Sequence, residues 1–312
     1  MEFIIIESKD ILNIPEINGF PYEPAISKHF SDPVIIRIPT RFHCQQKHKF
    51  TTNPLPFIKL KYEKYDQYIL LKDRPNKFIL EYLKLNFKLI MLKCPIKIGS
   101  IRQPNHEILY SVVQKTEFFT SFKQNGIKYY WNPFFTMFSA GNIGERIRMS
   151  KLEIKNEFIV DLYCGIGYFI LPMLRNNQAI ACDLNPYSIH GLKRAVQEMG
   201  LESHIQIFQG DHAVFVEKYK ERADRILMGY LPCPFSSLEY AILGLKKKGG
   251  VIHFHKAIEK ENVISFSEVL KEKLKVYFEI VEIKNIEKVK LYSPKVYHYV
   301  YDIILKNKYN SN

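Results

Sequence analysis

The stretch "EFIVDLYCGIGYFILPML", residues 157–174, decides how this sequence folds. It reads as one long apolar run, but Asp161, Gly165 and Gly167 interrupt it. A charged aspartate near the middle of a membrane span costs roughly 2.5–3.5 kcal/mol, so a buried strand followed by a tight turn explains the run better. The start, "MEFIIIESKD", has too short an apolar core for a secretory signal. We therefore expect a cytoplasmic protein.

Positive charge exceeds negative charge throughout the chain. The 312 residues carry 45 Lys and Arg against 32 Asp and Glu, a net charge of +13. Residues 1–130 hold 20 basic and 12 acidic side chains (+8), and residues 131–312 hold 25 and 20 (+5). Such an excess is typical of proteins with a polyanionic partner, because basic side chains that neutralise phosphates release counterions. A Lys-rich genome would raise the charge equally well, so charge alone leaves both explanations open.

The first part of the chain, residues 1–130, predicts a smaller α+β domain with short strands punctuated by proline and a helix around 77–90. The segment "HCQQKH" at 43–48 has metal-ligand residue types, but its spacing fits no tetrahedral zinc site. The five cysteines are scattered without a Cys-x-x-Cys pair, which predicts reduced thiols. We expect no metal in this protein.

From residue 157 onward, strand-like and helix-like segments alternate. Buried strands are expected at 158–163, 179–184, 205–210, 224–231 and 250–255. Helices are expected to begin at 167 and to span 185–200, about 212–221 and 236–247. This alternation specifies a parallel sheet with helices on both faces. The last two strands, 277–292 and 295–306, are joined by a short link and so pair antiparallel.

Together these segments predict an α/β fold for residues 131–312: a Rossmann-like domain with a mostly parallel seven-stranded sheet and an antiparallel C-terminal hairpin. In such a sheet the ligand lies beyond the C-terminal strand ends, and a glycine turn after the first strand lets backbone approach it. Gly165 and Gly167 occupy that turn. Ile170 replaces the third glycine of the dinucleotide fingerprint, so a pyrophosphate is less expected.

Three aspartates end the first three strands of this domain. Asp183 follows Asp161 by 22 residues, at the place where a carboxylate accepts both ribose hydroxyls. Asp211 ends the third strand, where a carboxylate accepts from an adenine amino group. Each could instead cap the next helix, and for Asp211 alone that reading is favoured. Three in succession favour a binding site for adenosine without phosphates, which fits S-adenosylmethionine better than NAD.

Several segments resemble one family. "DLYCGIGYF" and "ACDLNP" resemble the class I S-adenosylmethionine-dependent transferase core. Four others resemble the tRNA wybutosine-synthesising aminocarboxypropyltransferases, which are related to tRNA guanosine-N1 methyltransferases: 137–149, 224–230, 249–255 and 290–302. The resemblance covers roughly residues 100–305. It implies transfer of the 3-amino-3-carboxypropyl group of S-adenosylmethionine to C7 of 4-demethylwyosine, at position 37 of tRNA-Phe, with release of 5′-methylthioadenosine.

The resemblance also implies residue roles. Ser139 and Arg146 would contact the cofactor, Asp183 the ribose, and Asp211 with His212 the adenine. A serine hydroxyl and an arginine fork suit the polar groups of the amino-acid arm. The family pattern Asp-Asn-Arg after the third strand is replaced here by Asp-His-Ala, so a basic contact is lost.

The residues after the fourth strand separate the relatives. Guanosine-N1 methyltransferases carry Asn-Leu-Pro there, whereas residues 229–232 read Gly-Tyr-Leu-Pro, without an amide. A carbon nucleophile has no N–H to be accepted, and Gly229 leaves room for the amino-acid arm, although a glycine also suits a strand-end turn. Glu145 is a candidate acceptor for the C7 proton, and Arg102 a candidate clamp on the base or its phosphate.

Two alternatives stay open at this point. A tRNA guanosine-37 N1-methyltransferase would use the same cofactor and the same pocket. A tRNA-binding protein without turnover would keep the fold and lose the chemistry, but the intact Gly165, Gly167, Asp183 and Asp211 argue against it. In each case tRNA is the expected partner, and we predict no membrane and no protein partner.

Overall fold

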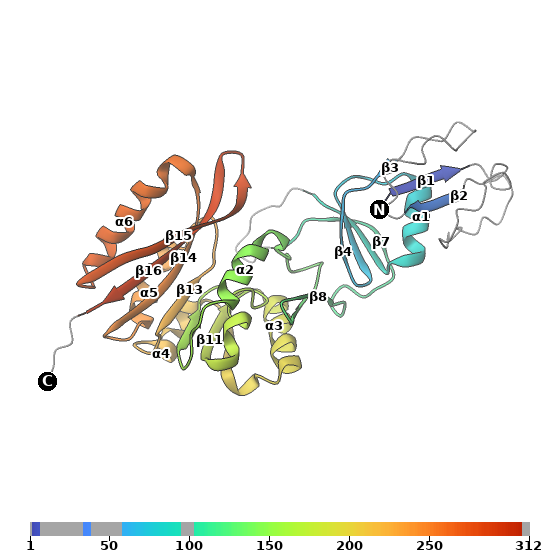
Figure 1. The fold of residues 1–312 in the computed structure, drawn as a ribbon. Coiled ribbons are helices and arrows are strands. Elements are labelled where there is room, and N and C mark those ends of the chain that lie inside the picture. The colour runs from blue at the N-terminus through green and yellow to red at the C-terminus, as the bar shows by residue number, and fades with distance from the viewer. Residues whose placement is uncertain (1, 7–33, 39–57, 95–102, 308–312) are drawn as a thin grey trace. The chain divides into compact units, whose positions relative to one another are not determined.

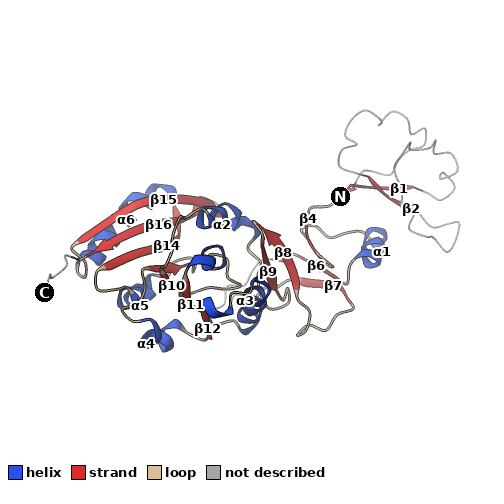
Figure 2. Cartoon of the chain, turned by 60° about the horizontal axis from the view of Figure 1, so that its bottom comes forward, coloured by secondary structure: helices blue, strands red, loops and turns tan. Residues whose placement is uncertain are grey.

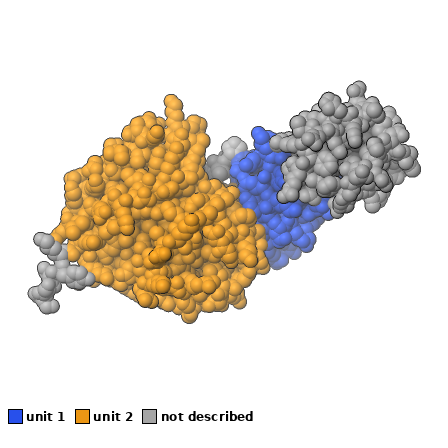
Figure 3. All heavy atoms as spheres, viewed as in Figure 1, with its two compact units in different colours: residues 1–97, 105–120 blue, residues 98–104, 121–312 orange. Residues whose placement is uncertain are grey.

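The computed structural model describes residues 2–6, 34–38, 58–94 and 103–307. Backbone contacts divide the chain into two compact units, residues 1–97 with 105–120 and residues 98–104 with 121–312 (Figure 3). This division precedes the predicted boundary between residues 130 and 131. The hairpin of β8 (Thr120–Gln124) and β9 (Ile127–Trp131) therefore belongs almost wholly to unit 2.

The described residues of unit 1 form two small sheets and one helix (Figure 1). One sheet has the order β2-β1-β3, with β1 at Glu2–Ile6, β2 at Val34–Ile38 and β3 at Ile58–Lys59. The other has the order β4-β5-β6-β7, at Tyr62–Tyr65, Tyr68–Leu71, Leu89–Leu92 and Glu107–Ser111. Helix α1 (Lys77–Asn86) begins where the Asn76 side chain accepts from the Ile79 N–H, and it buries Ile79 and Leu83 against β5 and β6.

In the described part of unit 2, seven strands form one sheet in the order β12-β11-β10-β13-β14-β16-β15 (Figure 2). Their bounds are Phe158–Asp161 (β10), Gln178–Asp183 (β11), Ile205–Gln209 (β12), Arg225–Met228 (β13), Gly249–Glu259 (β14), Ile280–Ser293 (β15) and Val296–Lys306 (β16). The strands from β12 to β14 are parallel, and β16 pairs antiparallel with both β14 and β15. The predicted sheet and its C-terminal hairpin are confirmed.

The order of the strands places a topological switch point at β10. The chain runs outward from β10 to β11 and β12 and then returns to β13 on the other side of β10. Because such crossovers are right-handed, the helices of the two halves cover opposite faces of the sheet. In open sheets of this kind ligands bind at the switch point, beyond the C-terminal strand ends. The fold alone therefore places the site next to Asp161.

Three helices share one hydrophobic core with one face of the sheet. They are α4 (Val216–Tyr219), α5 (Leu238–Gly244) and α6 (Val263–Lys275). Fully buried side chains of this core include Val160 and Ile226 from the strands and Leu270 from α6. Figure 1 shows α6 along the long strands β15 and β16. Helix α6 was not foreseen from the sequence.

Helices α2 (Ile143–Ser150) and α3 (Pro186–Met199) belong to the other half of the fold. Helix α3 agrees with its prediction: the Asn185 side chain caps its start, and Gly200 ends it with a left-handed φ of +66°. It packs closely on β9, because a Cβ built at Gly191 would lie 2.1 Å from the Tyr130 carbonyl oxygen.

The helix predicted to begin at residue 167 is instead one short 3-10 helix, η3 (Leu171–Asn176). The Asn177 side-chain amide donates to the Met173 carbonyl at 2.6 Å, taking the oxygen that a continuing α-helix would use. Among the described residues, no helix is both long and apolar enough to cross a membrane.

Candidate active site

Asp161 lies at the C-terminal end of β10 and is completely buried. Its Oδ1 accepts from the Tyr163 N–H at 3.2 Å, while its Oδ2 has no hydrogen-bond partner among the described residues. Burial, with the backbone hydrogen bond opposing it, raises the pKa of Asp161 to about 8. A buried carboxyl oxygen without a partner is unusual in a folded protein and indicates a place for a polar ligand or water.

The turn after β10 needs its two glycines. Gly165 has φ +53° and Gly167 φ +90°, a region that side chains rarely adopt. A Cβ at Gly167 would also lie 2.6 Å from the Leu171 side chain and 2.7 Å from Leu192 of α3. The turn is therefore held both by its backbone conformation and by close packing.

Asp183 fixes this turn from the neighbouring strand. Its Oδ2 accepts from the Gly165 N–H at 2.8 Å, and its Oδ1 accepts from the Asn185 N–H at 2.9 Å. The residue is only partly buried, and each carboxylate oxygen carries a second lone pair. Asp183 can therefore position the glycine turn and still accept hydroxyl groups of a ligand.

Asp211 and His212 follow β12 at the same edge of the sheet. Asp211 caps the next turn by accepting from the Ala213 N–H at 2.9 Å, which agrees with the capping role considered for it from the sequence. Its side chain stays 54% exposed. The His212 ring is buried between two tyrosine rings, with centroids 5.1 Å from Tyr163 and 5.3 Å from Tyr240. Burial lowers the pKa of His212, so the ring is neutral near pH 7.

Tyr163 and Tyr230 extend this aromatic surface, and neither was assigned to the site from the sequence. The Tyr163 ring also lies 5.1 Å from the Tyr230 ring, and its hydroxyl bonds to the Ser237 hydroxyl. Tyr163 stands inside the quoted stretch, two residues after Asp161, and Tyr230 lies in the segment after β13. Both tyrosines lie next to strand ends, where side chains face the ligand site of a parallel sheet. This position was the sequence signal that could have assigned them to the site.

Ser139 and Arg146 lie together before β10. Arg146 is 1% exposed, and it donates to the Ser139 carbonyl at 3.0 Å and to the Gln124 side chain at 2.6 Å. Its guanidinium lies 5.5–5.6 Å from three ring centroids, those of Tyr129, Phe138 and Tyr168. Arg146 thus holds the backbone of Ser139 in place.

Tyr168 joins this segment to the glycine turn. Its hydroxyl donates to the Met137 carbonyl at 2.8 Å and accepts from the Ser139 N–H at 3.0 Å. A Cβ at Gly165 would meet the Tyr168 ring at 3.4 Å. The structure therefore brings Ser139, Asp161, Gly165, Gly167 and Asp183 into one neighbourhood.

Lys290 is a third residue that sequence reasoning missed. It comes from β15, and its Nζ donates to the Ser139 Oγ at 2.9 Å. A Cβ built at Gly141 would lie 2.8 Å from the lysine side chain, so this glycine makes room for it. Only the pairing of strands far apart in sequence places this cation beside Ser139.

Glu145 is buried and already bonded. Both its oxygens accept from Arg148 at 2.8 Å, and Arg148 also bonds both oxygens of Asp302 at 2.6 and 3.1 Å. Burial raises the pKa of Glu145 although Arg148 opposes the shift. Its role as a proton acceptor stays a prediction, and Arg102 lies outside the described residues.

Gly229 follows β13 without a positive φ, so backbone conformation does not require a glycine there. A Cβ at this position would lie 3.1 Å from the Phe169 ring. Phe169 in turn packs on the buried His255, with ring centroids 4.7 Å apart. The position is tight, and a side chain there would press on this ring.

The chain has the fold of the class I S-adenosylmethionine-dependent transferases, with a switch point at β10, a glycine turn, and aspartates at successive strand ends. The family described as "TRM5/TYW2 methyltransferase domain" matches residues 120–286, and the chain belongs to this family. Within the residues that the structure describes, no three His, Cys, Asp or Glu side chains gather as metal ligands do.

Similar proteins carry names that refer to wybutosine or demethylwyosine in tRNA. The "tRNA(Phe) (4-demethylwyosine(37)-C(7)) aminocarboxypropyltransferase" of Methanocaldococcus jannaschii is 32% identical over 252 residues, which cover 78% of this chain and 97% of that protein. The "tRNA wybutosine-synthesizing protein 2/3/4" of Arabidopsis thaliana is 34% identical over 190 residues, 58% of this chain but 19% of that protein. The chain thus spans about a fifth of this plant relative.

Solved structures share the fold. The crystal structure of P. horikoshii TYW2 in complex with MeSAdo has a TM-score of 0.65 and 28% sequence identity, over 80% of this chain and 91% of that chain.

Proposed function

We propose that this protein transfers the 3-amino-3-carboxypropyl group of S-adenosylmethionine to C7 of 4-demethylwyosine at position 37 of tRNA(Phe). The observation that carries the proposal is the match to the M. jannaschii aminocarboxypropyltransferase through 97% of that protein. The segment Gly229–Pro232 supports it, because it offers no side-chain amide to hold a nitrogen nucleophile or the methionine arm. Guanosine-N1 methyl transfer is the runner-up.

The strand-end residues fit S-adenosylmethionine. The Oδ2 of Asp161 has no partner in the described residues and would be satisfied through the methionine part or a water next to it. Asp183 keeps lone pairs for the ribose hydroxyls, and the rings of Tyr163 and His212 offer an apolar surface to adenine. MeSAdo in the similar P. horikoshii structure supports an adenosine site here.

The amino-acid arm fits the segment before β10. The Ser139 hydroxyl, which accepts a hydrogen bond from the Lys290 ammonium, would hold the carboxylate of the amino-acid arm. Arg146 would act as a positioning residue, because its guanidinium bonds the Ser139 carbonyl within a cage of rings. This assignment revises the predicted direct contact of Arg146.

When bound, S-adenosylmethionine supplies an activated γ-methylene carbon, with 5′-methylthioadenosine as the leaving group. The chain's own contribution is alignment: its residues hold the base so that C7, and no nitrogen, faces that carbon. A new C7–carbon bond leaves C7 with a proton to lose. Glu145 is our proposed acceptor, since burial raises its pKa, and Arg102 remains the proposed clamp on the base or its phosphate.

We propose tRNA as the partner, with residues 1–130 contributing to its binding. The +8 charge of this part supports contacts to the phosphate backbone. Affinity for tRNA should then fall steeply with salt. Binding that does not change with salt would assign the positive charge to genome composition instead.

The experiment combines purified protein, S-adenosylmethionine and tRNA(Phe) that carries 4-demethylwyosine. Mass spectrometry of the digested nucleosides should show the base enlarged by an aminocarboxypropyl group. The matched control is the same tRNA with unmodified guanosine at position 37, which should stay unchanged. A methyl group gained by that guanosine would replace this proposal with the runner-up.

A further inference from the structure

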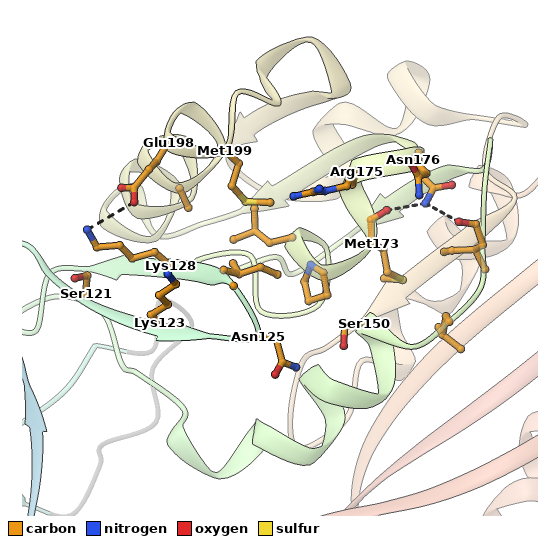
Figure 4. Close-up of a pocket in the computed structure, with 18 residues that line it drawn as sticks. Ser121, Lys123, Asn125, Lys128, Ser150, Met173, Arg175, Asn176, Glu198 and Met199 are labelled. Atoms are coloured by element: carbon orange, nitrogen blue, oxygen red, sulfur yellow. Dashed lines mark hydrogen bonds and ion pairs between the residues drawn. The ribbon is translucent and has the colours of Figure 1, made fainter.

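Unit 2 contains a second hollow, which we name the hairpin groove. It has a volume of about 950 Å³ and is lined by the β8–β9 hairpin, the end of α2, η3 and the last turns of α3 (Figure 4). All of its lining residues lie between Ser121 and Met199. The groove is therefore built entirely within unit 2.

The hairpin groove lies at the edge of the sheet opposite the glycine turn. Asn177, which lines it, directly precedes β11, whereas Asp183 ends that strand. A strand rises about 3.3 Å per residue, so the six residues of β11 separate Asn177 from Asp183 by roughly 20 Å. Leu171, on another wall of the groove, packs against Gly167 of the glycine turn, but none of the residues that line the groove is a proposed cofactor contact.

Positive charge surrounds the groove. Lys123 and Lys128 come from the hairpin and Arg175 from the opposite wall, against one acidic residue, Glu198 (Figure 4). Lys128 pairs with Glu198 at 3.6 Å. Lys123 and Arg175 are exposed and make no hydrogen bond or ion pair with any residue that the structure describes. Two cations are thus available to an anionic ligand.

The remaining lining combines apolar and hydrogen-bonding groups. Apolar side chains come from β9, the loop after α2, η3 and α3, and they include Ile127, Leu152, Leu171, Met173, Ala195 and Met199. The exposed side chains of Asn125 and Asn176 add donors and acceptors at the rim. An apolar floor suits a nucleobase, and cations with amides suit a phosphate and sugar.

We propose that the hairpin groove binds a nucleotide of the tRNA substrate, with its phosphates at Lys123 and Arg175. The inference rests on the proposed function, since it takes its RNA from that reaction. A contact in the groove adds affinity without using any of the residues proposed to hold the cofactor. A free nucleotide has the same chemistry, and the test separates the two sources.

The test compares two double variants of the full chain with equal loss of charge. Lys123→Ala with Arg175→Ala removes the two available cations of the groove. Lys247→Ala with Lys273→Ala removes two exposed lysines of unit 2 that do not line it. Filter binding of tRNA is measured from low to high salt. Loss of two phosphate contacts should lower the slope of log K against log salt by about 1.4–1.8 in the groove variant only.

Turnover distinguishes this inference from the proposed function. Wild-type product formation tests the function, whereas the groove variant should raise KM for tRNA and leave kcat unchanged. Equal salt slopes in the two variants, with wild-type turnover intact, would overturn the inference. The second probe is AMP: if it binds the wild type but not the groove variant, while tRNA affinity is the same in both, the groove holds a free nucleotide and the RNA assignment is wrong.

Discussion

Asp183 connects the glycine turn with the start of α3, because its carboxylate accepts hydrogen bonds from both the Gly165 N–H and the Asn185 N–H. Sequence position alone indicated a ribose contact for this residue. It could not indicate that the same oxygens also position the glycine turn, because that depends on how β11 stands beside β10.

Asp183→Ala should weaken S-adenosylmethionine binding about tenfold or more, because a hydrogen bond to a charged group contributes roughly 1.5–3 kcal/mol. Titration calorimetry measures the change. Asp183→Asn is the matched variant: its amide oxygen can still accept from Gly165, so it should fold as the wild type does and still bind more weakly. Wild-type affinity in both folded variants would remove Asp183 from the site.

Asp161→Asn should increase stability near neutral pH while it weakens cofactor binding. Burial raises the pKa of Asp161 to about 8, above the ordinary value of 3.8. Because the folded-state pKa is the higher one, the wild type loses up to about 1.4 kcal/mol per pH unit relative to the variant as pH rises between these values. Urea unfolding at pH 5 and pH 7 should show a gap that widens with pH. A constant gap would mean that the buried carboxyl carries no such cost.

Helix α2 is tied to the sheet by a chain of buried charged groups. Arg148 bridges Glu145 and Asp302, and Asp302 accepts from His253 Nδ1 at 2.6 Å. Burial alone would raise the pKa of Asp302, but the bonds from His253 and Arg148 hold it well below its usual range. Arg225 lies 2.6 Å from His253 Nε2, and since arginine only donates, the neutral ring must carry its proton on Nδ1.

Arg148→Met should destabilise the protein by about 3–5 kcal/mol, because it leaves two buried carboxylates without their cation. Lys271→Met is the control, since it breaks only an exposed pair with Glu268 on α6 and should cost less than about 1 kcal/mol. Urea denaturation at pH 7 compares them. Similar midpoints for the two variants would show that the buried chain of charges does not hold α2.

Elements with a regular pattern were predictable, and those set by tertiary packing were not. Helix α3 was predictable from Asn185 and Gly200 at its ends, and the strands were predictable from their apolar runs. The helix predicted from 167 is a 3-10 helix over Leu171–Asn176, and the Asn177 side chain stops it from continuing, a contact that no periodicity encodes. Lys290 was missed for a similar reason, since β15 reaches Ser139 only through the fold.

At the scale of the whole molecule, one fold carries two proposed sites that share no residue. The strand ends around β10 would hold the group donor, and the hairpin groove would hold another part of the RNA. The family is described as a methyltransferase domain, whereas the similar M. jannaschii protein is named an aminocarboxypropyltransferase, so the fold does not decide the reaction. The carbon that this site presents to the base decides it.

The spent cofactor reports that carbon directly. Attack on the γ-methylene leaves 5′-methylthioadenosine, whereas attack on the methyl group leaves S-adenosylhomocysteine. One chromatogram of the reaction with 4-demethylwyosine-containing tRNA(Phe) should therefore show methylthioadenosine in proportion to modified tRNA. Stoichiometric S-adenosylhomocysteine with guanosine-containing tRNA would contradict aminocarboxypropyl transfer and leave only the cofactor site standing.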